Sequence, residues 1–295
     1  MRVAVIVNPV AGTGATFERA RRQAEHAADL LASCGVEPDV VLTERAGHAA
    51  ELARGAVERG ARVVVAWGGD GTVNEVASAL AFGPAALGII PSGSGNGLAR
   101  LLHLPRAPRA AFDRLLHGRD RQIDLGEANG RLFANMAGVG FDATVAARFA
   151  RLGRSRRGFL RYAAIVLDQI GRFRPVTCDL TLDEGCVETT TAALVTFANG
   201  RQWGNGAVIA PNAELDDGLL DAVVAGADGT LDVLRAVPRL FLGTIDRAPR
   251  VAIRKVRCAQ VRSAGLLPFH VDGEALVADG MLDVLVRPAA LRVRV

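Results

Sequence analysis

The stretch VVVAWGGDGTVNEVASAL, residues 63–80, decides how the first part of this chain folds. Its apolar run from residue 63 to residue 67 is uninterrupted, which is typical of a strand buried on both faces. Glycines and Asp70 follow at once, and apolar residues then recur at helical spacing as far as Leu80. A strand, a glycine loop and a helix in this order predict a phosphate-binding arrangement at the carboxyl end of the strand.

Asp70 sets this loop apart from an ordinary phosphate loop. Glycines let the backbone approach an anion closely, and the helix that follows offers the positive end of its dipole. Thr72 and Glu75 form a T-x-x-E capping pattern, which predicts that this helix begins at Thr72. A carboxylate would repel a phosphate unless a divalent cation or a coordinated water lay between them. The alternative is a tight turn in which Asp70 is an ordinary turn residue.

Two more loops of this kind follow predicted strands. The loop from Asn8 to Gly14 in VNPVAGTG follows the first strand, and PSGSGNG, residues 91–97, follows the fourth. Because the carboxyl ends of parallel strands meet at one edge of a sheet, we expect the three loops to lie together. The chain has no G-x-x-x-x-G-K-[ST] loop and no G-x-G-x-x-G after the first strand. Its single lysine, Lys255, lies far along the chain, which argues against Walker-type ATPases and protein kinases.

Strand and helix patterns alternate from the N-terminus to about residue 127. Near-continuous apolar strands between helices predict an α/β domain over 1–127, with a parallel sheet covered by helices on both faces. The predicted strands are Arg2–Val7, Val40–Thr43, Arg62–Trp67 and Ala86–Ile90, and the predicted helices are Phe17–Ala32, Gly47–Arg59, Thr72–Leu80 and Gly97–Leu102.

The pattern changes after Asp124. Asn129-Gly130 predicts a hairpin between residues 123–127 and 131–135, and residues 141–171 have a helical, arginine-rich pattern. Short β-rich runs separated by turn residues then predict an all-β, sandwich-like second domain over 128–286. These runs are Val176–Leu182, Thr189–Ala198, Leu219–Ala225, Val251–Cys258, Phe269–Val271 and Met281–Val286, with one helix at Thr230–Leu240.

Composition indicates a globular, cytoplasmic protein. Half of the 295 residues are hydrophobic and 22% are charged, and the four cysteines lack metal or redox spacing. No stretch approaches the ~20 apolar residues of a membrane span. The net charge of +4 comes from arginines, which fit either a solvated surface or an attraction to anionic lipid or nucleotide phosphate. Nucleic acid is not an expected partner, since the charge is modest and stacking motifs are lacking.

The ordered motifs resemble the diacylglycerol kinase catalytic-domain family of lipid kinases, which includes bacterial diacylglycerol, sphingosine and ceramide kinases. GGDGTVNEV is similar to the family's GGDGT signature, NPVAG to its first nucleotide loop and PSGSGNGLAR to its P-x-G-[ST]-x-N stretch. The resemblance continues through IDLG at 123–126, NGRQWGNG at 199–206, DDGLLD at 216–221 and HVDGEAL at 270–276. GGDG[TS] alone also occurs in NAD kinases and phosphofructokinases, so the ordered set carries the resemblance.

This resemblance implies an ATP-dependent lipid kinase. The first domain would bind ATP and be completed by residues 287–295, and the β-sandwich would accept a lipid alcohol such as diacylglycerol, a sphingoid base or ceramide. The residues it implies at the nucleotide are Asn8, Pro9, Ala11, Gly12, Thr43, Gly68, Gly69, Asp70, Gly71, Thr72, Ser94 and Asn96.

The resemblance also implies an acidic network around Mg²⁺ and the phosphates. Asp70, Asp124 and Asp272 would organise water and Mg²⁺, and Glu274 would be the general base for the lipid hydroxyl. If the VDGE segment is extended, Asp272 and Glu274 point to one face, whereas the alternative is an acidic β-turn. Gly97 stands where many members have an aspartate of this network. A structural Mg²⁺ site is implied at Leu215, Asp217 and Leu219, although DDGLLD alone reads more readily as a turn.

The segment 148–174 carries eight arginines among aromatic and aliphatic residues. Such a segment can settle on an anionic bilayer, which would place the protein at the inner face of the membrane, although an ordinary exposed helix has the same pattern. A homodimer is left open. The alternatives to a lipid kinase are an NAD kinase and a homologue that binds nucleotide or lipid without catalysis.

Overall fold

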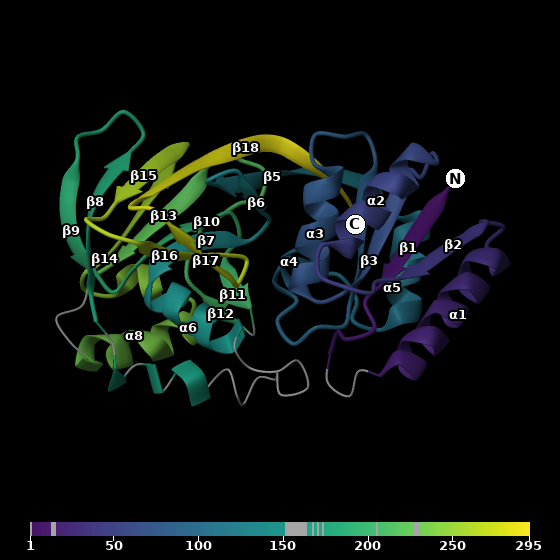
Figure 1. Cartoon of the computed structure of the whole chain (residues 1–295), viewed down its shortest axis with the longest axis horizontal. Coiled ribbons are helices and arrows are strands. Elements are labelled where there is room, and N and C mark those ends of the chain that lie inside the picture. The colour runs from purple at the N-terminus through teal and green to yellow at the C-terminus, as the bar shows by residue number, and fades with distance from the viewer. Residues whose placement is uncertain are drawn as a thin grey trace. The chain divides into compact units, whose positions relative to one another are not determined.

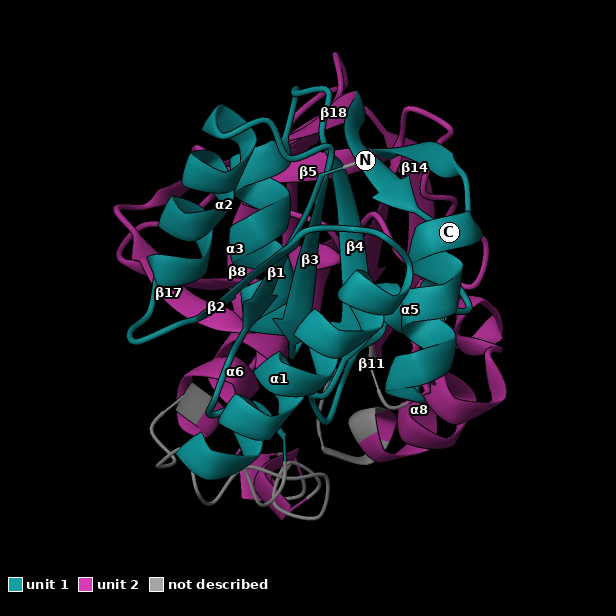
Figure 2. Ribbon diagram, turned by 90° about the vertical axis from the view of Figure 1, so that its right-hand side faces the viewer, with its two compact units in different colours: residues 1–123, 289–295 teal, residues 124–288 magenta. Residues whose placement is uncertain are grey.

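The computed structural model describes residues 2–12, 16–150, 164–166, 168–169, 171–172, 174–204, 206–226 and 230–295. These residues form two compact units, which Figure 2 colours separately: residues 1–123 with 289–295, and residues 124–288. The first boundary lies between residues 123 and 124, where the sequence predicted 127 and 128, and the chain re-enters the first unit at residue 289 rather than 287.

The first unit contains a parallel sheet in which β2 (Pro38–Leu42) is partly buried and the other three strands are fully buried. Its order is β2, β1 (Val3–Val7), β3 (Val63–Gly68) and β4 (Ala86–Pro91). The end of β18 (Met281–Arg294) adds a further parallel strand beside β4, with Arg292 opposite Ala86. Every residue of β1, β3 and β4 is buried, which confirms the two-sided cover expected from their apolar sequences.

Helices cover both faces of this sheet. Figure 2 shows α2 (His48–Glu58) and α3 (Asp70–Leu80) together on one side of the strands and α5 (Pro108–His117) on the other. The sequence did not predict α5, although Phe112 of this helix packs edge-on against Trp67 with ring centroids 5.7 Å apart. The remaining helices are α1 (Phe17–Ser33) and α4 (Gly97–Leu101).

The predicted start of α3 was wrong, because the helix begins at Asp70 and not at Thr72. Glu75 does not cap its own helix. Its carboxylate accepts hydrogen bonds from the backbone N–H groups of Gly47 and Ala49, 2.9 and 3.0 Å away, at the start of α2. Gly47 is the N-cap of α2 and has no side chain with which to cap it, so a neighbouring helix supplies the acceptor.

The second unit is an antiparallel β-sandwich, as the sequence predicted. One sheet has the order β14-β13-β10-β7-β16-β17, and the other contains β15, β8, β9, β5, β6 and the first part of β18 (Figure 1). Phe133, Phe197 and Phe269 lie in the apolar core between them. The strand bounds are β5 Asp120–Ala128, β6 Arg131–Phe133, β7 Met136–Gly140, β8 Val176–Leu182, β9 Glu188–Ala192, β10 Leu194–Ala198, β13 Leu220–Ala225, β14 Val251–Val256, β15 Cys258–Arg262, β16 Leu267–Val271 and β17 Glu274–Ala278, with a small hairpin of β11 (Gln202–Gly204) and β12 (Ala207–Val208).

Two predicted strands are each divided between the sheets. The run 189–198 becomes β9 and β10, and the run 251–258 ends at Val256 before β15 begins at Cys258. One residue separates the two strands in each case, so the β-rich sequence continues across the break and gives no turn signal.

The structure can be compared with the two helices that the sequence predicted in the second unit. α6 (Phe141–Ala150) begins where the sequence predicted, but most of the rest of that predicted helix lies outside the described residues. α8 (Thr230–Leu242) ends two residues beyond the predicted Leu240.

We expect Glu75→Ala to destabilise the first unit by about 1 kcal/mol, because it removes the acceptor for two N–H groups at the start of α2. Urea unfolding followed by circular dichroism measures the loss. Glu75→Gln keeps one acceptor oxygen and should lose less. Equal free energies of unfolding for the alanine variant and the wild type would show that water replaces Glu75 as the acceptor with no loss of stability.

Candidate functional site

The three glycine-rich loops of the first unit are joined to one another. Asn8, directly after β1, donates from its side-chain amide to the Thr72 hydroxyl, 2.7 Å away. Ser92, directly after β4, donates its N–H to the carbonyl oxygen of Gly68 at the end of β3. The loops therefore meet at the carboxyl edge of the parallel sheet, as the sequence predicted from their positions after the strands.

Close backbone contact explains several of the glycines in these loops. A methyl group on Gly93 would lie 2.7 Å from the Cα atom of Gly69, and one on Gly12 would lie 2.4 Å from the carbonyl oxygen of Ser92. Gly12 also has a φ of +86°, which disfavours any other residue. Gly71 differs, since a methyl group there meets nothing within 4 Å. Gly93 and Gly12 are thus required for packing between loops, and Gly71 leaves open space beside its backbone.

Asp70 links the loop after β3 to the loop after β4. Its Oδ1 accepts from the N–H of Gly97 at 2.6 Å and its Oδ2 from the N–H of Asn96 at 2.8 Å. Asn96 has a φ of +52°, and its side-chain amide pairs with both the N–H and the carbonyl of Gly93. The carboxylate that would repel a phosphate therefore holds the neighbouring loop in place through backbone N–H groups. A carboxylate oxygen accepts more than one hydrogen bond, so this role leaves room for a water or cation.

The other residues expected at the nucleotide lie in or beside these loops. Thr43 is buried at the end of β2 and donates its N–H to the Val7 carbonyl. Ser94 is exposed in the third loop. Pro9 and Ala11 lie in the first loop, in which Ala11 donates its N–H to the Asn8 carbonyl. Residues 13–15 of that loop lie outside the described part of the chain.

In the second unit, the VDGE segment is a tight turn between β16 and β17. Asp272 and Gly273 have φ values of +45° and +84°, and Val271 pairs with Glu274. The acidic β-turn was therefore the correct alternative and the extended segment was wrong. Two central residues with positive φ are typical of a type I′ hairpin, for which Asp-Gly is a favoured sequence.

Asp272 accepts three backbone hydrogen bonds within its own unit. The N–H groups of Ala134, Asn135 and Met136 lie 2.9 to 3.0 Å from its carboxylate oxygens. Ala134 and Asn135 lie between β6 and β7, and Met136 begins β7, so Asp272 fixes the turn to that segment.

Beneath this turn lies a buried polar cluster that the sequence did not predict. His270 is 3.1 Å from Asp142 through Nε2, and its Nδ1 accepts from the N–H of Gly273 at 3.3 Å. Asp142 also accepts from the Thr196 hydroxyl at 2.6 Å. Because Nδ1 accepts a hydrogen bond, Nε2 carries the proton that is donated to Asp142. The only sequence signal was the histidine that precedes VDGE, and its spacing from Asp142 and Thr196 does not indicate a contact.

Asp124 is buried and tied to two other segments of the second unit. Its Oδ2 accepts from the N–H of Gly218 at 2.7 Å, and its own N–H donates to the Leu215 carbonyl. Asn199 donates from its side-chain amide to the carbonyls of Asp124 and Ala134. Asn199 lies in the NGRQWGNG motif, to which sequence analysis gave no role.

Glu274, the expected general base, is exposed on the surface of the second unit. Its Oε1 lies 3.7 Å from the guanidinium of Arg131, and the Glu274 side chain is 64% exposed. An ion pair of this length and exposure contributes little to stability. The carboxylate is therefore accessible, and the turn at Asp272 and Gly273 sets its position at the start of β17.

At the residues expected to form a structural metal site, the side chain of Lys255 lies against Asp217. The ammonium of Lys255 is 2.5 Å from Asp217 Oδ2, and the other oxygen of Asp217 accepts from the N–H of Leu219. Burial lowers the pKa of Lys255, but the hydrogen bond to Asp217 and the charge of Asp221 outweigh it and raise the pKa above its usual value. Lys255 is therefore protonated at neutral pH. Among the described residues, no group of three or more His, Cys, Asp or Glu side chains could hold a metal ion.

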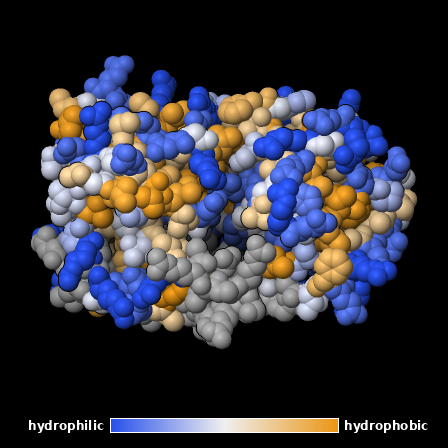
Figure 3. Space-filling model, in the orientation of Figure 1, coloured by the Kyte–Doolittle hydropathy of each residue, from blue (hydrophilic) through white to orange (hydrophobic). Residues whose placement is uncertain are grey.

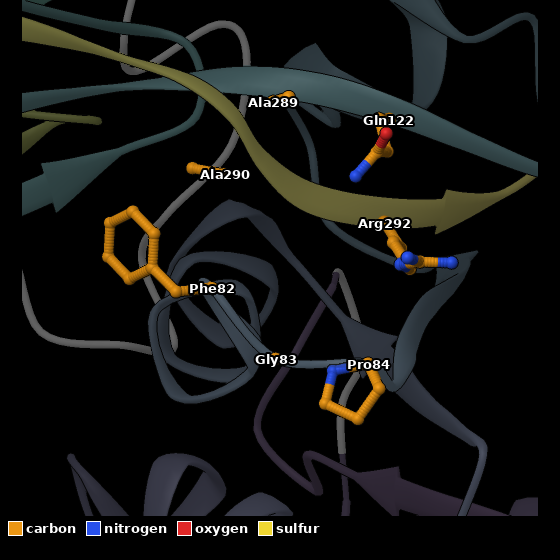
Figure 4. A pocket seen from close by; sticks show the side chains of 7 residues that line it. All are labelled: Phe82, Gly83, Pro84, Gln122, Ala289, Ala290 and Arg292. Atoms are coloured by element: carbon orange, nitrogen blue, oxygen red, sulfur yellow. The ribbon is translucent and has the colours of Figure 1, made fainter.

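A hollow of 320 Å³ in the first unit lies away from these loops. Figure 4 shows Phe82, Pro84, Gln122 and Arg292 among the residues that line it, with Ala289 and Ala290 on β18. None of its lining residues is one of those expected at the nucleotide or the metal. We assign it no part in the candidate site.

The features of the described surface that bear on a membrane contact are its apolar residues and the arginine-rich segment. Figure 3 shows apolar and polar residues interspersed over the face in view. Most of the arginine-rich segment 148–174 lies outside the described residues, and within it Arg148 and Arg172 both pair with Asp168. No helix in the described part of the chain is both long and apolar enough to span a bilayer.

Comparison with known families decides the affiliation of the chain. Residues 2–128 match the diacylglycerol kinase catalytic domain, and residues 135–295 match the YegS C-terminal NAD kinase beta sandwich-like domain. The chain belongs to the diacylglycerol kinase family of lipid kinases. The family that the ordered motifs indicated is thereby confirmed.

Relatives of this lipid kinase are found in several bacteria. A diacylglycerol kinase of Mycobacterium tuberculosis is 34% identical over 99% of this chain and 94% of its own length. A Pseudomonas aeruginosa protein named probable lipid kinase YegS-like is 37% identical over 88% of this chain and 85% of its own. The fold is also that of a diacylglycerol kinase structure from Bacillus anthracis, with a TM-score of 0.73 at 19% identity over 99% of this chain and 96% of that one.

We expect Gly93→Ala to destabilise the first unit by about 1–3 kcal/mol, because the added methyl group meets the backbone of Gly69. Gly71→Ala is the matched control. Gly71 lies in a helix with open space at its Cβ position, so alanine should leave stability unchanged or raise it slightly. Thermal unfolding of the two variants checks this, and equal melting temperatures would contradict the close contact between the loops.

Proposed function

We propose that this lipid kinase transfers the γ-phosphoryl group of ATP, bound with Mg²⁺, to the hydroxyl of a lipid alcohol. The observation that carries the proposal is the union of three glycine-rich loops at one sheet edge. Asp70 joins the second loop to the third through the N–H groups of Asn96 and Gly97, and the Asn8–Thr72 hydrogen bond joins the first loop to the second. Phosphoryl transfer depends chiefly on fixed N–H donors and cations around the phosphates, so a rigid loop cluster is what the reaction requires.

The nucleotide would be held by the backbone of these loops. Gly71 offers backbone with open space beside it, and Ser94 offers an exposed hydroxyl. Both lie next to segments fixed by Asp70 and Asn96, so their N–H and O–H donors are placed before a ligand arrives. In this proposal Mg²⁺ enters with ATP as part of the substrate, and it supplies charge neutralisation at the phosphates.

Glu274 is proposed as the general base. The lipid hydroxyl attacks the γ-phosphorus, the bond from that phosphorus to the β-γ bridging oxygen breaks, and the hydroxyl proton passes to Glu274. ADP and a phosphorylated lipid result. The exposure of the Glu274 carboxylate and its placement by the Asp272-Gly273 turn support this role. Asp272 itself is proposed as a positioning residue, because its carboxylate accepts from three backbone N–H groups.

Diacylglycerol is the first lipid to test. A relative with 34% identity over nearly the whole chain is named diacylglycerol kinase, and the Pseudomonas relatives are named probable lipid kinases without a stated acceptor. Sphingoid bases, ceramide and phosphatidylglycerol are the further candidates, because each presents a free hydroxyl on a lipid.

The deciding experiment measures transfer from radiolabelled ATP to a panel of lipids in mixed micelles, with and without Mg²⁺, for the wild type and for Glu274→Gln. We expect phosphorylated lipid from the wild type only with Mg²⁺. Glu274→Gln should reduce kcat by about 100-fold or more, because a general base commonly contributes at least that factor. Its thermal stability should not change, since the Glu274 side chain is 64% exposed.

Arg131→Gln is the matched control. It removes the ion pair with Glu274 but leaves the carboxylate, so most of the turnover should remain. Full turnover by Glu274→Gln would refute the base assignment. Transfer to NAD and to none of the lipids would favour an NAD kinase, and tight ATP binding without any transfer would favour a non-catalytic protein.

A further inference from the structure

The chain's only lysine, Lys255, lies on β14 of the second unit, and its side chain reaches the acidic loop of residues 212–219. Lys255 is on β14, opposite Asp221 on β13, and its ammonium reaches Asp221 Oδ2 at 3.5 Å and Asp217 Oδ2 at 2.5 Å. The ammonium also lies 3.5 Å from the backbone carbonyl oxygen of Asn212. Two carboxylates and a carbonyl are the kinds of oxygen ligand that hard divalent cations prefer.

This arrangement holds the loop of residues 212–219 to the strand pair. Asp217 joins the loop to Lys255, and its second oxygen accepts from the N–H of Leu219. The Asp221 side chain is 3% exposed, so its charge needs a partner inside the protein. The same loop contacts Asp124 through Gly218 and Leu215, so its conformation determines what surrounds that buried carboxylate.

We propose that the ammonium of Lys255 is a built-in cation that replaces a bound Mg²⁺ in this loop. A lysine ammonium is a compact point charge with several donors, so it can satisfy Asp217, Asp221 and the Asn212 carbonyl together. Its ammonium, 2.5 Å from Asp217 Oδ2, already places a positive charge at this carboxylate and would repel a divalent cation there. The loop therefore holds its conformation without a divalent cation, and Leu215, Asp217 and Leu219 are structural residues.

The first test compares melting temperatures of the nucleotide-free protein in EDTA and in excess MgCl₂. We expect the wild type to melt at the same temperature in both. We also expect elemental analysis to find the same Mg²⁺ content in the dialysed wild type and in dialysed Asp217→Asn. A saturable rise of the wild-type melting temperature with Mg²⁺, absent from Asp217→Asn, would overturn the proposal. This experiment uses no lysine variant, so it tests the proposal even if such a variant fails to fold.

The second test removes the charge. Lys255→Met keeps the length of the side chain, and we expect it to lower the melting temperature in EDTA by roughly 3–6 °C. Excess Mg²⁺ or Ca²⁺ should restore part of the loss, because a cation can then reach the two carboxylates. Lys255→Arg keeps the charge and should lose less than Lys255→Met.

A double-mutant cycle separates the ion pair from simple packing. In an Asp217→Asn background, Lys255→Met should cost clearly less than it does in the wild type, because one partner of the pair is already gone. Additive losses in the cycle, or a Lys255→Met variant as stable as the wild type in EDTA, would contradict the role of the ammonium. Failure of every divalent cation to restore stability would also contradict it.

Discussion

The first unit depends on the two hydrogen bonds that Asp70 accepts from the N–H groups of Asn96 and Gly97. They join the loops after two neighbouring strands. The Asp70 carboxylate is thereby bound to backbone N–H groups, although it lies among glycines whose backbone suits a phosphate. Gly12 and Gly93 are then required by close contact between the loops. The close backbone contacts between the loops both pack them together and fix the N–H groups that are proposed to bind phosphate.

The second unit uses the same device, in which carboxylates accept backbone N–H groups from other segments. Asp272 binds the chain between β6 and β7, and Asp124 binds the loop at Gly218. His270 and Asp142 support the Asp272-Gly273 turn from below. Three of the aspartates implied by the family resemblance are therefore anchors of loops in this structure. Glu274 differs from them, because its carboxylate is exposed.

Much of the fold could be predicted from the sequence because apolar runs and glycine loops are local signals. The four parallel strands of the first unit and the antiparallel second unit follow from periodicity alone. The start of α3 could not be predicted, because Glu75 caps a different helix and that contact is tertiary. The breaks at Ala193 and Arg257 were also missed, since one residue carries the chain from one sheet to the other without a turn signal.

The candidate site was predictable in part for the same reason. Glycine and hydroxyl residues after strands identified the three loops, but the partners of Asp70 depend on loop-to-loop packing that spacing does not encode. VDGE was ambiguous between an extended segment and a turn, and the positive φ values at Asp272 and Gly273 decide for the turn. From the sequence, Lys255 was interpreted only as lying too far along the chain to be a phosphate-binding lysine. Its approach to Asp217 could not be predicted, because it depends on the pairing of β13 with β14.

The central claim is that the three glycine-rich loops, joined through Asp70 and Asn8, bind the phosphates of a nucleotide. Hydrogen–deuterium exchange with and without a non-hydrolysable ATP analogue and Mg²⁺ tests it most directly. The account predicts slower exchange in peptides that contain residues 8–12, 68–72 and 92–97, and little change in the hollow lined by Phe82 and Arg292. Protection confined to other segments, or no protection under conditions where the analogue binds, would contradict it.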